Sequence, residues 1–281
     1  MHNGSDSNTA GAAGKTIVIT GASDGIGASA ARILQQAGPG NRLVVVGRDE
    51  AKTLAVPGYK HLTADFTSLA QVRELAEELR GIGGIDVLAN NAGGMFDGPV
   101  ITEDGWERNW QVNTVAPFLL TSLLRPQLRG AVVNTSSMAS HLMGRFDPGE
   151  LDSRTDFDSQ RAYGNAKVGV NLMTRYFHLH GIPSVAFHPG VIDSSFGSRS
   201  TGLLSKAYAT RFAHSVMASP DKGGLVLAQF IAGQPGIHWD SGYYYGKPGR
   251  KGFTRRGARG DRLARRVFDE VASRVNVEWG L

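Results

Sequence analysis

The sequence predicts an α/β fold, in which a doubly wound, parallel sheet of seven strands carries helices on both of its faces. From residue 15 onward, short apolar runs alternate with amphipathic helical patterns, and this alternation is typical of parallel strands joined by right-handed crossovers. Some runs, such as Val44-Val45-Val46, are apolar at consecutive positions, as expected for strands that are covered on both faces. No repeat, low-complexity linker or break in composition divides the chain, so we expect a single domain.

Each expected strand is a short apolar run that ends at polar or glycine-rich positions. In chain order, the strands are expected at residues 15–20, 42–47, 59–64, 85–90, 131–135, 184–188 and 242–245. The segments between them show helical periodicity. One apolar helical face, for example, is formed by Leu69, Val72, Leu75, Ala76 and Leu79.

The two ends of the chain differ from this pattern, which assigns residues 15–245 to the domain. Residues 1–14 are small and polar and have no apolar core, so we expect a disordered leader and no secretory signal. Residues 246–281 carry ten Lys/Arg and four Asp/Glu, so we expect a basic C-terminal extension.

Within this extension, apolar residues recur every four positions, which predicts a helix docked on the domain with its basic residues outside. The stripe consists of Leu263, Val267, Val271 and Val275. Binding of nucleic acid or another anionic partner by the basic segment is the alternative. We expect the docked helix and no nucleic-acid partner.

The composition excludes several kinds of site. The chain has no cysteine, which excludes disulfides, thiolate metal sites and cysteine nucleophiles and is consistent with the reducing cytoplasm, where we expect the protein. No run approaches the roughly 18 apolar residues of a membrane span. The histidines show no metal-like grouping, so no metal site is expected.

The first strand leads into a glycine-rich turn and then into a helical pattern. The turn contains Gly21, Ser23, Asp24, Gly25, Ile26 and Gly27. Glycines permit a tight turn that brings backbone N–H groups close to a diphosphate, and the helix N-terminus adds partial positive charge. Because the order strand, turn, helix is the one such a motif requires, we expect a dinucleotide site. The alternative is that the glycines serve only the turn.

The end of the second strand indicates which dinucleotide is bound. An acidic residue there would bind the ribose 2′-hydroxyl of NAD, whereas an arginine suits the 2′-phosphate of NADP. Gly47 occupies this end and Arg48 follows it, which favours NADP(H), with NAD(H) as the alternative. We expect Asp49 to cap the next helix, and Asp24 is an unfavourable charge beside a phosphate.

Tyr163 and Lys167 lie four residues apart in a predicted helix, so they share one face. The unperturbed pKa of tyrosine is about 10, and a neighbouring ammonium favours the phenolate and lowers that pKa. Such a tyrosine can donate a proton to a carbonyl oxygen or accept one from an alcohol. A surface pair without catalytic function is the alternative.

These motifs, taken together, resemble the short-chain dehydrogenase/reductase family over residues 15–245. The glycine turn is followed by Asn90-Asn91-Ala92-Gly93, by Ser136-Ser137, by Tyr163 and Lys167, and by Pro189-Gly190. The resemblance implies a Rossmann-fold enzyme with a Ser–Tyr–Lys core that an asparagine completes. Ser137 and Tyr163 are 26 residues apart, and this spacing is similar to that of the retinol dehydrogenase and protochlorophyllide reductase-like branch, which generally uses NADP(H).

The resemblance also implies a role for each matching residue. Tyr163 matches the acid/base, Lys167 the lysine that lowers its pKa and binds the nicotinamide ribose, and Asn113 the asparagine that supports a proton-relay water. Ser137 matches the serine that orients the substrate oxygen, with Ser136 as the alternative. Further cofactor contacts are implied for Asp65, Phe66, Asn91, Ala92, Gly93, Pro189, Gly190, Val191 and Ser194.

Substrate contacts are expected from the segments that follow the strands, because ligands bind at the carboxyl ends of parallel strands. These segments are residues 94–101, 138–146 and 194–217. Their apolar members are Met95, Phe96, Met138, Leu142, Phe196, Leu203 and Leu204. They predict a mainly apolar pocket. The alternative for several of them is that they only pack the segments that cover the site.

The function expected is hydride transfer between NADP(H) and a small carbonyl or alcohol substrate. A nucleotide sensor of the same fold that has lost catalysis is the alternative, because fold alone does not establish function. Analogy with the family implies a homodimer or homotetramer that associates through the helices of Asn113 and Tyr163. The basic extension could block one such interface.

Overall fold

A computed structural model describes residues 14–152, 154–190, 219–254 and 260–279. Its centre is one sheet of eight strands with the order β3-β2-β1-β4-β5-β6-β7-β8. The strands are β1 (Thr16–Thr20), β2 (Arg42–Gly47), β3 (Lys60–Thr63), β4 (Ile85–Asn90), β5 (Leu128–Thr135), β6 (Ser184–Phe187), β7 (Tyr243–Lys247) and β8 (Arg250–Lys251). The first seven are parallel, and β8 is antiparallel to β7.

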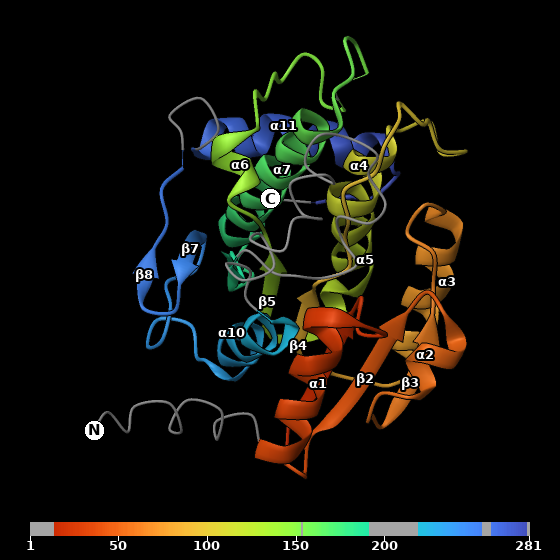
Figure 1. The fold of residues 1–281 in the computed structure, drawn as a ribbon, viewed down its shortest axis with the longest axis vertical. Coiled ribbons are helices and arrows are strands. Elements are labelled where there is room, and N and C mark those ends of the chain that lie inside the picture. The colour runs from red at the N-terminus through yellow and green to blue at the C-terminus, as the bar shows by residue number, and fades with distance from the viewer. Residues whose placement is uncertain (1–13, 153, 191–218, 255–259, 280–281) are drawn as a thin grey trace.

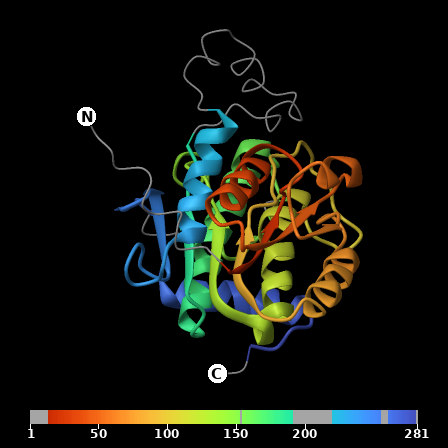
Figure 2. The same cartoon turned by 90° about the horizontal axis from the view of Figure 1, so that it is seen from below.

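Helices cover both faces of this sheet. In chain order they are α1 (Gly25–Ala37), α2 (Glu50–Leu54), α3 (Leu69–Arg80), α4 (Arg108–Trp110), the π-helical segment η2 (Gln111–Val115), α5 (Ala116–Leu124), the short 3-10 helix η3 (Arg125–Gln127), α6 (Ala139–Leu142), α7 (Ser159–Leu179), α10 (Pro220–Ala232) and α11 (Asp261–Arg274). Figures 1 and 2 show α1 and α10 on one face and α3, α5 and α7 on the other, with α11 outside α7.

The two hydrophobic cores follow from the alternation of side chains along the buried strands. In β1, Ile17 and Ile19 pack with α1 and α10, whereas Val18 packs with the helices of the opposite face. All five residues of β1 are buried. The continuous apolar runs therefore reflect strands covered on both sides, and the predicted single domain with a doubly wound parallel sheet is confirmed.

The sheet has eight strands where the sequence predicts seven. β7 continues past residue 245 to Lys247, and the chain turns through Pro248 and Gly249, whose φ is +74°. Proline followed by a glycine with positive φ is typical of a type II turn. β8 then pairs with β7 through two exposed residues, Arg250 and Lys251, and no apolar alternation marks so short a strand.

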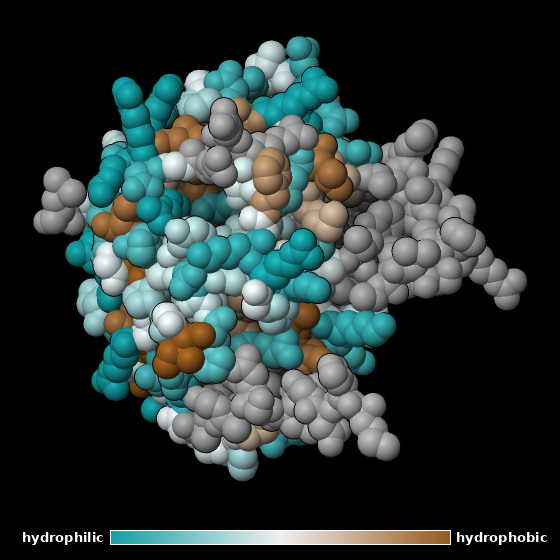
Figure 3. Space-filling model, turned by 90° about the vertical axis from the view of Figure 1, so that its left-hand side faces the viewer, coloured by the Kyte–Doolittle hydropathy of each residue, from teal (hydrophilic) through white to brown (hydrophobic). Residues whose placement is uncertain are grey.

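β8 forms an edge of the sheet, and its composition is one that discourages pairing with other chains. Charged residues on an edge strand, lysine above all, oppose addition of a further strand. Figure 3 views the molecule from the side on which Figure 1 draws β7 and β8, and this face is mostly hydrophilic with scattered apolar patches.

The C-terminal helix α11 packs on α7 and against α5. Val267, Phe268 and Val271 are buried, and the ring centroids of Phe268 and Phe118 lie 4.9 Å apart. Arg262 and Arg266 are exposed on the other side of the helix. The apolar stripe of α11 therefore faces the domain, and most charged residues of this helix are exposed.

Candidate active site

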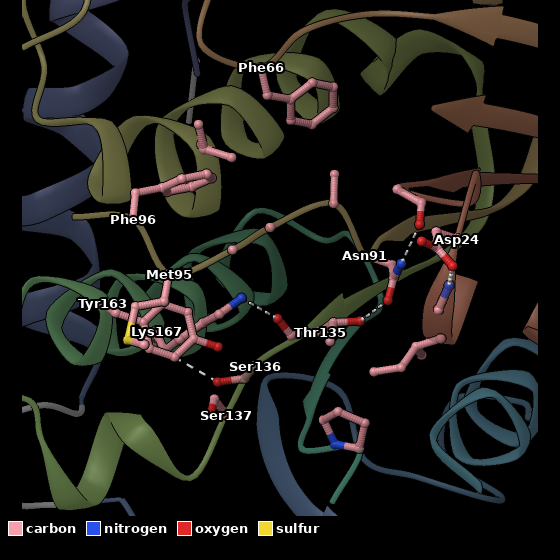
Figure 4. Close-up of a pocket in the computed structure, with 18 of the residues that line it drawn as sticks. Asp24, Phe66, Asn91, Met95, Phe96, Thr135, Ser136, Ser137, Tyr163 and Lys167 are labelled. Atoms are coloured by element: carbon pink, nitrogen blue, oxygen red, sulfur yellow. Dashed lines mark hydrogen bonds between the residues drawn. The ribbon is translucent and has the colours of Figure 1, made fainter. Parts of the chain in front are cut away.

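A cleft of about 470 Å³ opens at the carboxyl ends of the parallel strands, and Figure 4 shows part of its lining. Most of the residues that the sequence singles out meet here. They are Gly21, Ser23, Asp24, Gly25, Ile26, Arg48, Asp65, Phe66, Asn91, Ala92, Gly93, Ser137, Tyr163, Lys167, Pro189 and Gly190. Gly27 and Asn113 lie behind this lining, and Val191 and Ser194 lie outside the described residues.

The glycine turn connects β1 to α1 at one end of the cleft. Gly21 has a φ of +63°, and a Cβ atom there would lie 2.6 Å from Cα of Ala92. A Cβ atom on Gly27 would lie 2.5 Å from the carbonyl oxygen of Gly21. Asn91 fixes the turn, since its Nδ2 donates to the carbonyl oxygens of Thr20 and Gly21 at 3.1 and 3.2 Å. The glycines thus allow the turn, β4 and α1 to approach closely.

The first turn of α1 contains no acidic residue, and its N-cap is Asp24, whose side chain accepts from the N–H of Gly25 at 2.7 Å. This carboxylate lies 3.9 Å from the ammonium of Lys52, and both side chains are exposed. An exposed pair of this kind contributes little to stability. The pair does, however, place the Lys52 ammonium next to the Asp24 carboxylate, whose negative charge is unfavourable for phosphate binding.

The end of β2 has no room for a side chain. A Cβ atom on Gly47 would lie 2.1 Å from Oγ1 of Thr53 and 2.6 Å from Cβ of Ser23. An acidic residue, which would favour NAD at this position, therefore cannot be accommodated without rearrangement. Two cationic residues, Arg48 and Lys52, line the cleft beside it.

Asp49 and Asp65 are used locally by the backbone and by neighbouring side chains. Asp49 caps α2, as predicted, by accepting from the N–H of Lys52 at 3.0 Å. Asp65 accepts from the backbone N–H and the hydroxyl of Thr67 at 2.9 and 2.8 Å. These bonds to Thr67 order the loop that follows β3. This loop forms the far wall of the cleft at the end where the dinucleotide is expected.

Tyr163 and Lys167 lie one turn apart on α7 and face the cleft (Figure 4). They are only 7% and 3% exposed. The Lys167 Nζ lies 5.5 Å from the centroid of the Tyr163 ring and donates to the carbonyl oxygen of Thr135 at 2.9 Å. Burial lowers the pKa of Lys167 to about 7. The charge of this amine is therefore sensitive to its surroundings at neutral pH.

Ser136 and Ser137 follow β5 and both line the cleft (Figure 4). The hydroxyl of Ser136 is buried and donates to the carbonyl oxygen of Lys167 at 3.4 Å. Ser137 is half-buried, and its hydroxyl oxygen accepts from the N–H of Ala139 at 3.1 Å. The Ser137 hydroxyl hydrogen is not used in that bond, whereas the Ser136 hydrogen points to the backbone of α7.

Asn113 lies in η2, behind the wall of the cleft. Its amide nitrogen donates to the carbonyl oxygens of Gly94 and Asn109, each at 2.8 Å, and its amide oxygen accepts from the N–H of Gly94 at 3.1 Å. A Cβ atom on Gly93 would lie 2.5 Å from Oδ1 of Asn113 and 3.3 Å from Nζ of Lys167. Gly93 therefore separates the asparagine from the lysine.

The π-helical turn gives this segment its shape. The N–H of Ala116 donates to the carbonyl oxygen of Gln111, five residues earlier. Pro117 has no N–H and so cannot donate to the carbonyl oxygen of Asn113, four residues before it. Such interruptions are frequent at functional sites. The α-helical hydrogen-bond pattern is thus interrupted just upstream of Pro117.

The other end of the cleft is mainly apolar. Met95, Phe96, Met138 and Leu142 line it, as expected, whereas Phe196, Leu203 and Leu204 lie outside the described residues. The ring of Tyr163 packs in a small cluster with Met95, Ala139 and Met143. Figure 4 shows Met95 beside this ring.

Sequence reasoning did not single out several lining residues. Lys52 falls one helical turn after Arg48, and this spacing could have revealed it. Thr135 contributes a backbone carbonyl oxygen, for which side-chain identity gives no signal. His188 has no role assigned from the sequence, in which the histidines show no metal-like grouping. It lines the cleft, and burial, together with the nearby His141, lowers its pKa to about 4, so its imidazole is neutral at physiological pH.

Two further features of the described residues concern metal binding and membrane insertion. In the parts of the chain that the structure describes, no group of three or more His, Asp or Glu residues could hold a metal ion. No helix within these same parts has the length and apolar character needed to cross a bilayer.

Comparison with known proteins gives a consistent result. The family model described as short chain dehydrogenase matches residues 15–202. A protein of Streptomyces sp. (strain C5), provisionally named daunorubicin C-13 ketoreductase, is 38% identical in an alignment that covers 83% of each chain. Human retinol dehydrogenase 13 is 32% identical in an alignment that covers 94% of this chain and 86% of the human protein.

A solved structure is similar over almost the whole chain. The crystal structure of an uncharacterized protein from Mycobacterium paratuberculosis superposes with a TM-score of 0.74 at 27% identity, covering 96% of both chains. The likeness therefore includes the C-terminal part of the chain as well as the region that the family model matches.

Proposed function

Since the chain belongs to the short-chain dehydrogenase/reductase family and is an oxidoreductase acting on alcohol or carbonyl groups, we propose that it is an NADP(H)-dependent enzyme with a small, mainly apolar substrate. The observation that carries the proposal is the burial of Tyr163 and Lys167 together, in the same cleft as the glycine turn. A sensor of the same fold would not need this pair.

In the proposed reaction, the nicotinamide supplies the hydride when it is bound, and the residues of this chain handle the proton. Tyr163 donates its proton to the carbonyl oxygen during reduction and accepts one during oxidation. Lys167 in its ammonium form stabilises the phenolate of Tyr163. Ser137 donates a hydrogen bond to the substrate oxygen. Asn113 supports the relay water through its backbone carbonyl oxygen. The usual α-helical donor to this oxygen is missing, because Pro117, four residues later, has no N–H.

NADP(H) is the proposed cofactor because of the charges and the space at the end of β2. Arg48 and Lys52 are cations that line the cleft, and the position of Gly47 has no room for an acid. NAD(H) remains the alternative. The diphosphate is assigned to the glycine turn and the N-terminus of α1, and the adenine to the loop of Asp65 and Phe66. The remaining cofactor contacts are assigned to Asn91, Ala92, Gly93, Pro189, Gly190, Val191 and Ser194.

An apolar carbonyl substrate is supported by the lining of the second half of the cleft, where Met95 and Met143 pack with Tyr163 and Phe96 also lines the wall. The names of two relatives, a daunorubicin C-13 ketoreductase and a retinol dehydrogenase, refer to the reduction of a ketone and the oxidation of an alcohol. With NADPH, the direction favoured in a cell is carbonyl reduction. The cytoplasmic location stays a prediction.

The substitution Tyr163→Phe tests the function directly. It should reduce turnover of an aldehyde and ketone panel by roughly 10²–10⁴-fold, the usual contribution of general acid catalysis, while NADPH binding survives. Consumption of NADPH is followed by absorbance and binding by fluorescence. Tyr59→Phe, at an exposed tyrosine, serves as the matched control. Near-normal turnover in Tyr163→Phe would refute the assignment, and wild-type protein that binds NADPH without turnover would favour the sensor.

A further inference from the structure

Two asparagines on one helical stretch bind the extended segment that forms the wall of the cleft beside Tyr163. Asn113 accepts from the N–H of Gly94 and donates to its carbonyl oxygen. Asn109, one turn earlier, does the same for Phe96, at 2.8 Å to the N–H and 2.9 Å to the carbonyl oxygen. Each amide thus makes the pair of hydrogen bonds that a neighbouring strand would make. The backbone on both sides of Met95 is held in this way.

Met95 is the residue that this arrangement fixes. It is buried and packs in the cluster that contains the ring of Tyr163, and Figure 4 shows the two side chains together. A displacement of residues 94–96 would therefore change the space next to the Tyr163 ring. Methionine side chains are flexible, so the position of this one depends on the backbone that carries it.

Glu107 fixes the orientation of Asn109. It is fully buried, and its two carboxylate oxygens accept from the amide nitrogen of Asn109 at 3.0 Å and from the backbone N–H of Asn109 at 2.8 Å. The Asn109 amide nitrogen then donates one hydrogen to Glu107 and the other to Phe96. Rotation of the amide by 180° would break both bonds and bring its nitrogen against the N–H of Phe96.

Glu107 is itself held from a distant part of the chain. Its backbone N–H donates to a carboxylate oxygen of Asp152 at 3.1 Å, and that oxygen also accepts from Nε of Arg154 at 2.7 Å. A buried carboxylate is costly unless hydrogen bonds compensate for its desolvation. The hydrogen bonds that Glu107 accepts from Asn109 therefore offset part of the large free-energy cost of burying its carboxylate.

We propose that Asn109 and Glu107 are positioning residues that hold Met95 against Tyr163 and thereby set the affinity for the carbonyl substrate. The inference rests on the proposed function, because it takes Tyr163 as the residue that meets the substrate. The cofactor is bound mainly by other elements, so its affinity should not depend on this pair.

The test is Asn109→Asp, which keeps the shape of the side chain but cannot donate to Phe96 and sets a carboxylate against Glu107. We expect KM for the carbonyl substrate to rise about tenfold, the equivalent of one lost hydrogen bond, with the NADPH Kd unchanged. Adding Glu107→Gln should recover part of the loss, because the glutamine amide can donate to the new carboxylate. The matched controls are Asn276→Asp and Glu103→Gln, both at exposed positions.

Hydrogen exchange separates this inference from the proposed function. Protection of the Phe96 amide should fall about tenfold in Asn109→Asp, whereas the amide of Val18 in β1 should be unaffected. If wild-type protein turns over no carbonyl, the proposed function fails. The exchange data alone then decide whether Asn109 holds the backbone of Phe96. If wild type is active and Asn109→Asp lowers thermal stability without raising KM, the positioning role is overturned.

Discussion

At the residue scale, the missing side chain of Gly47 and the cations beside it determine the expected cofactor. A Cβ atom at Gly47 would overlap Thr53 and Ser23, so the acid that would recognise a ribose 2′-hydroxyl is excluded by packing. Arg48 and Lys52 present positive charge to the same region. Asp24 opposes binding of a phosphate, and its 3.9 Å pairing with Lys52 offsets part of that opposition.

We therefore predict that Arg48→Ala and Lys52→Ala each weaken NADPH binding by about ten- to a hundredfold, since a hydrogen bond to a charged group contributes roughly 1.5–3 kcal/mol. NADH binding should change less than about twofold, because NADH lacks the 2′-phosphate. Titration by nicotinamide fluorescence gives both Kd values. Arg32→Ala, at an exposed position on α1, is the control. An equal loss for NADPH and NADH would mean that neither cation recognises the phosphate.

Lys167 carries a stability cost that depends on pH. Burial lowers its pKa in the folded protein to about 7, from an ordinary value of 10.5. Between these values the unfolded chain binds the proton and the folded chain does not, so stability rises as the pH rises from 7 to 10.5. Below pH 7 both states bind the proton and the full cost of burying the ammonium remains.

Lys167→Met should consequently stabilise the cofactor-free protein at pH 6–7 by about 1–3 kcal/mol, less than the full pKa shift implies because Thr135 loses a donor. The gain should shrink toward pH 10. Thermal unfolding of variant and wild type across pH 6–10 measures the difference, and Lys222→Met, at an exposed lysine, controls for the loss of a charge. A difference that does not vary with pH would contradict the assigned cause.

At the scale of elements, the sequence predicts well wherever periodicity reports burial. The expected boundaries of β2 and β4 agree with the structure, because five of the six residues in each strand are buried. The helical face that begins at Leu69 likewise becomes the buried face of α3. β8 was missed because two charged residues carry no apolar alternation, and their pairing depends on the turn at Gly249.

The site could be predicted as far as its motifs reach. The glycine turn is marked by its place between a strand and a helix, Tyr163 and Lys167 are marked by their spacing on one helical face, and the family resemblance brings these motifs together. The contacts of Asn109 with Phe96 could not be found in this way, because a bond from a side chain to a backbone 13 residues away depends on how the chain folds back. The same holds for Thr135, which acts through its carbonyl oxygen.

At the scale of the whole molecule, the C-terminal helix closes one face of the domain. The rings of Tyr176 and Phe177 on α7 and of Phe118 on α5 pack against Phe268 and Trp279. A homodimer or homotetramer through α5 and α7 was the expectation from the family. Because the chain itself covers this surface of α5 and α7, an association of copies there would first require displacement of α11, and an oligomer that keeps α11 in place must use a different face.

Because α11 packs its aromatic ring against α5 and α7, we expect it to unfold together with the rest of the domain. Phe268→Ala should lower the free energy of unfolding by about 3–5 kcal/mol, as expected for a fully buried phenylalanine, because its ring contacts α5 and α7 and is 0% exposed. Urea denaturation followed by tryptophan fluorescence and by circular dichroism should show one coincident transition at a lower midpoint. Arg266→Ala, at an exposed position on α11, should leave the midpoint nearly unchanged. A separate early transition, with the main one unaltered, would instead mean that α11 unfolds as an appendage and adds little to the core that supports the site.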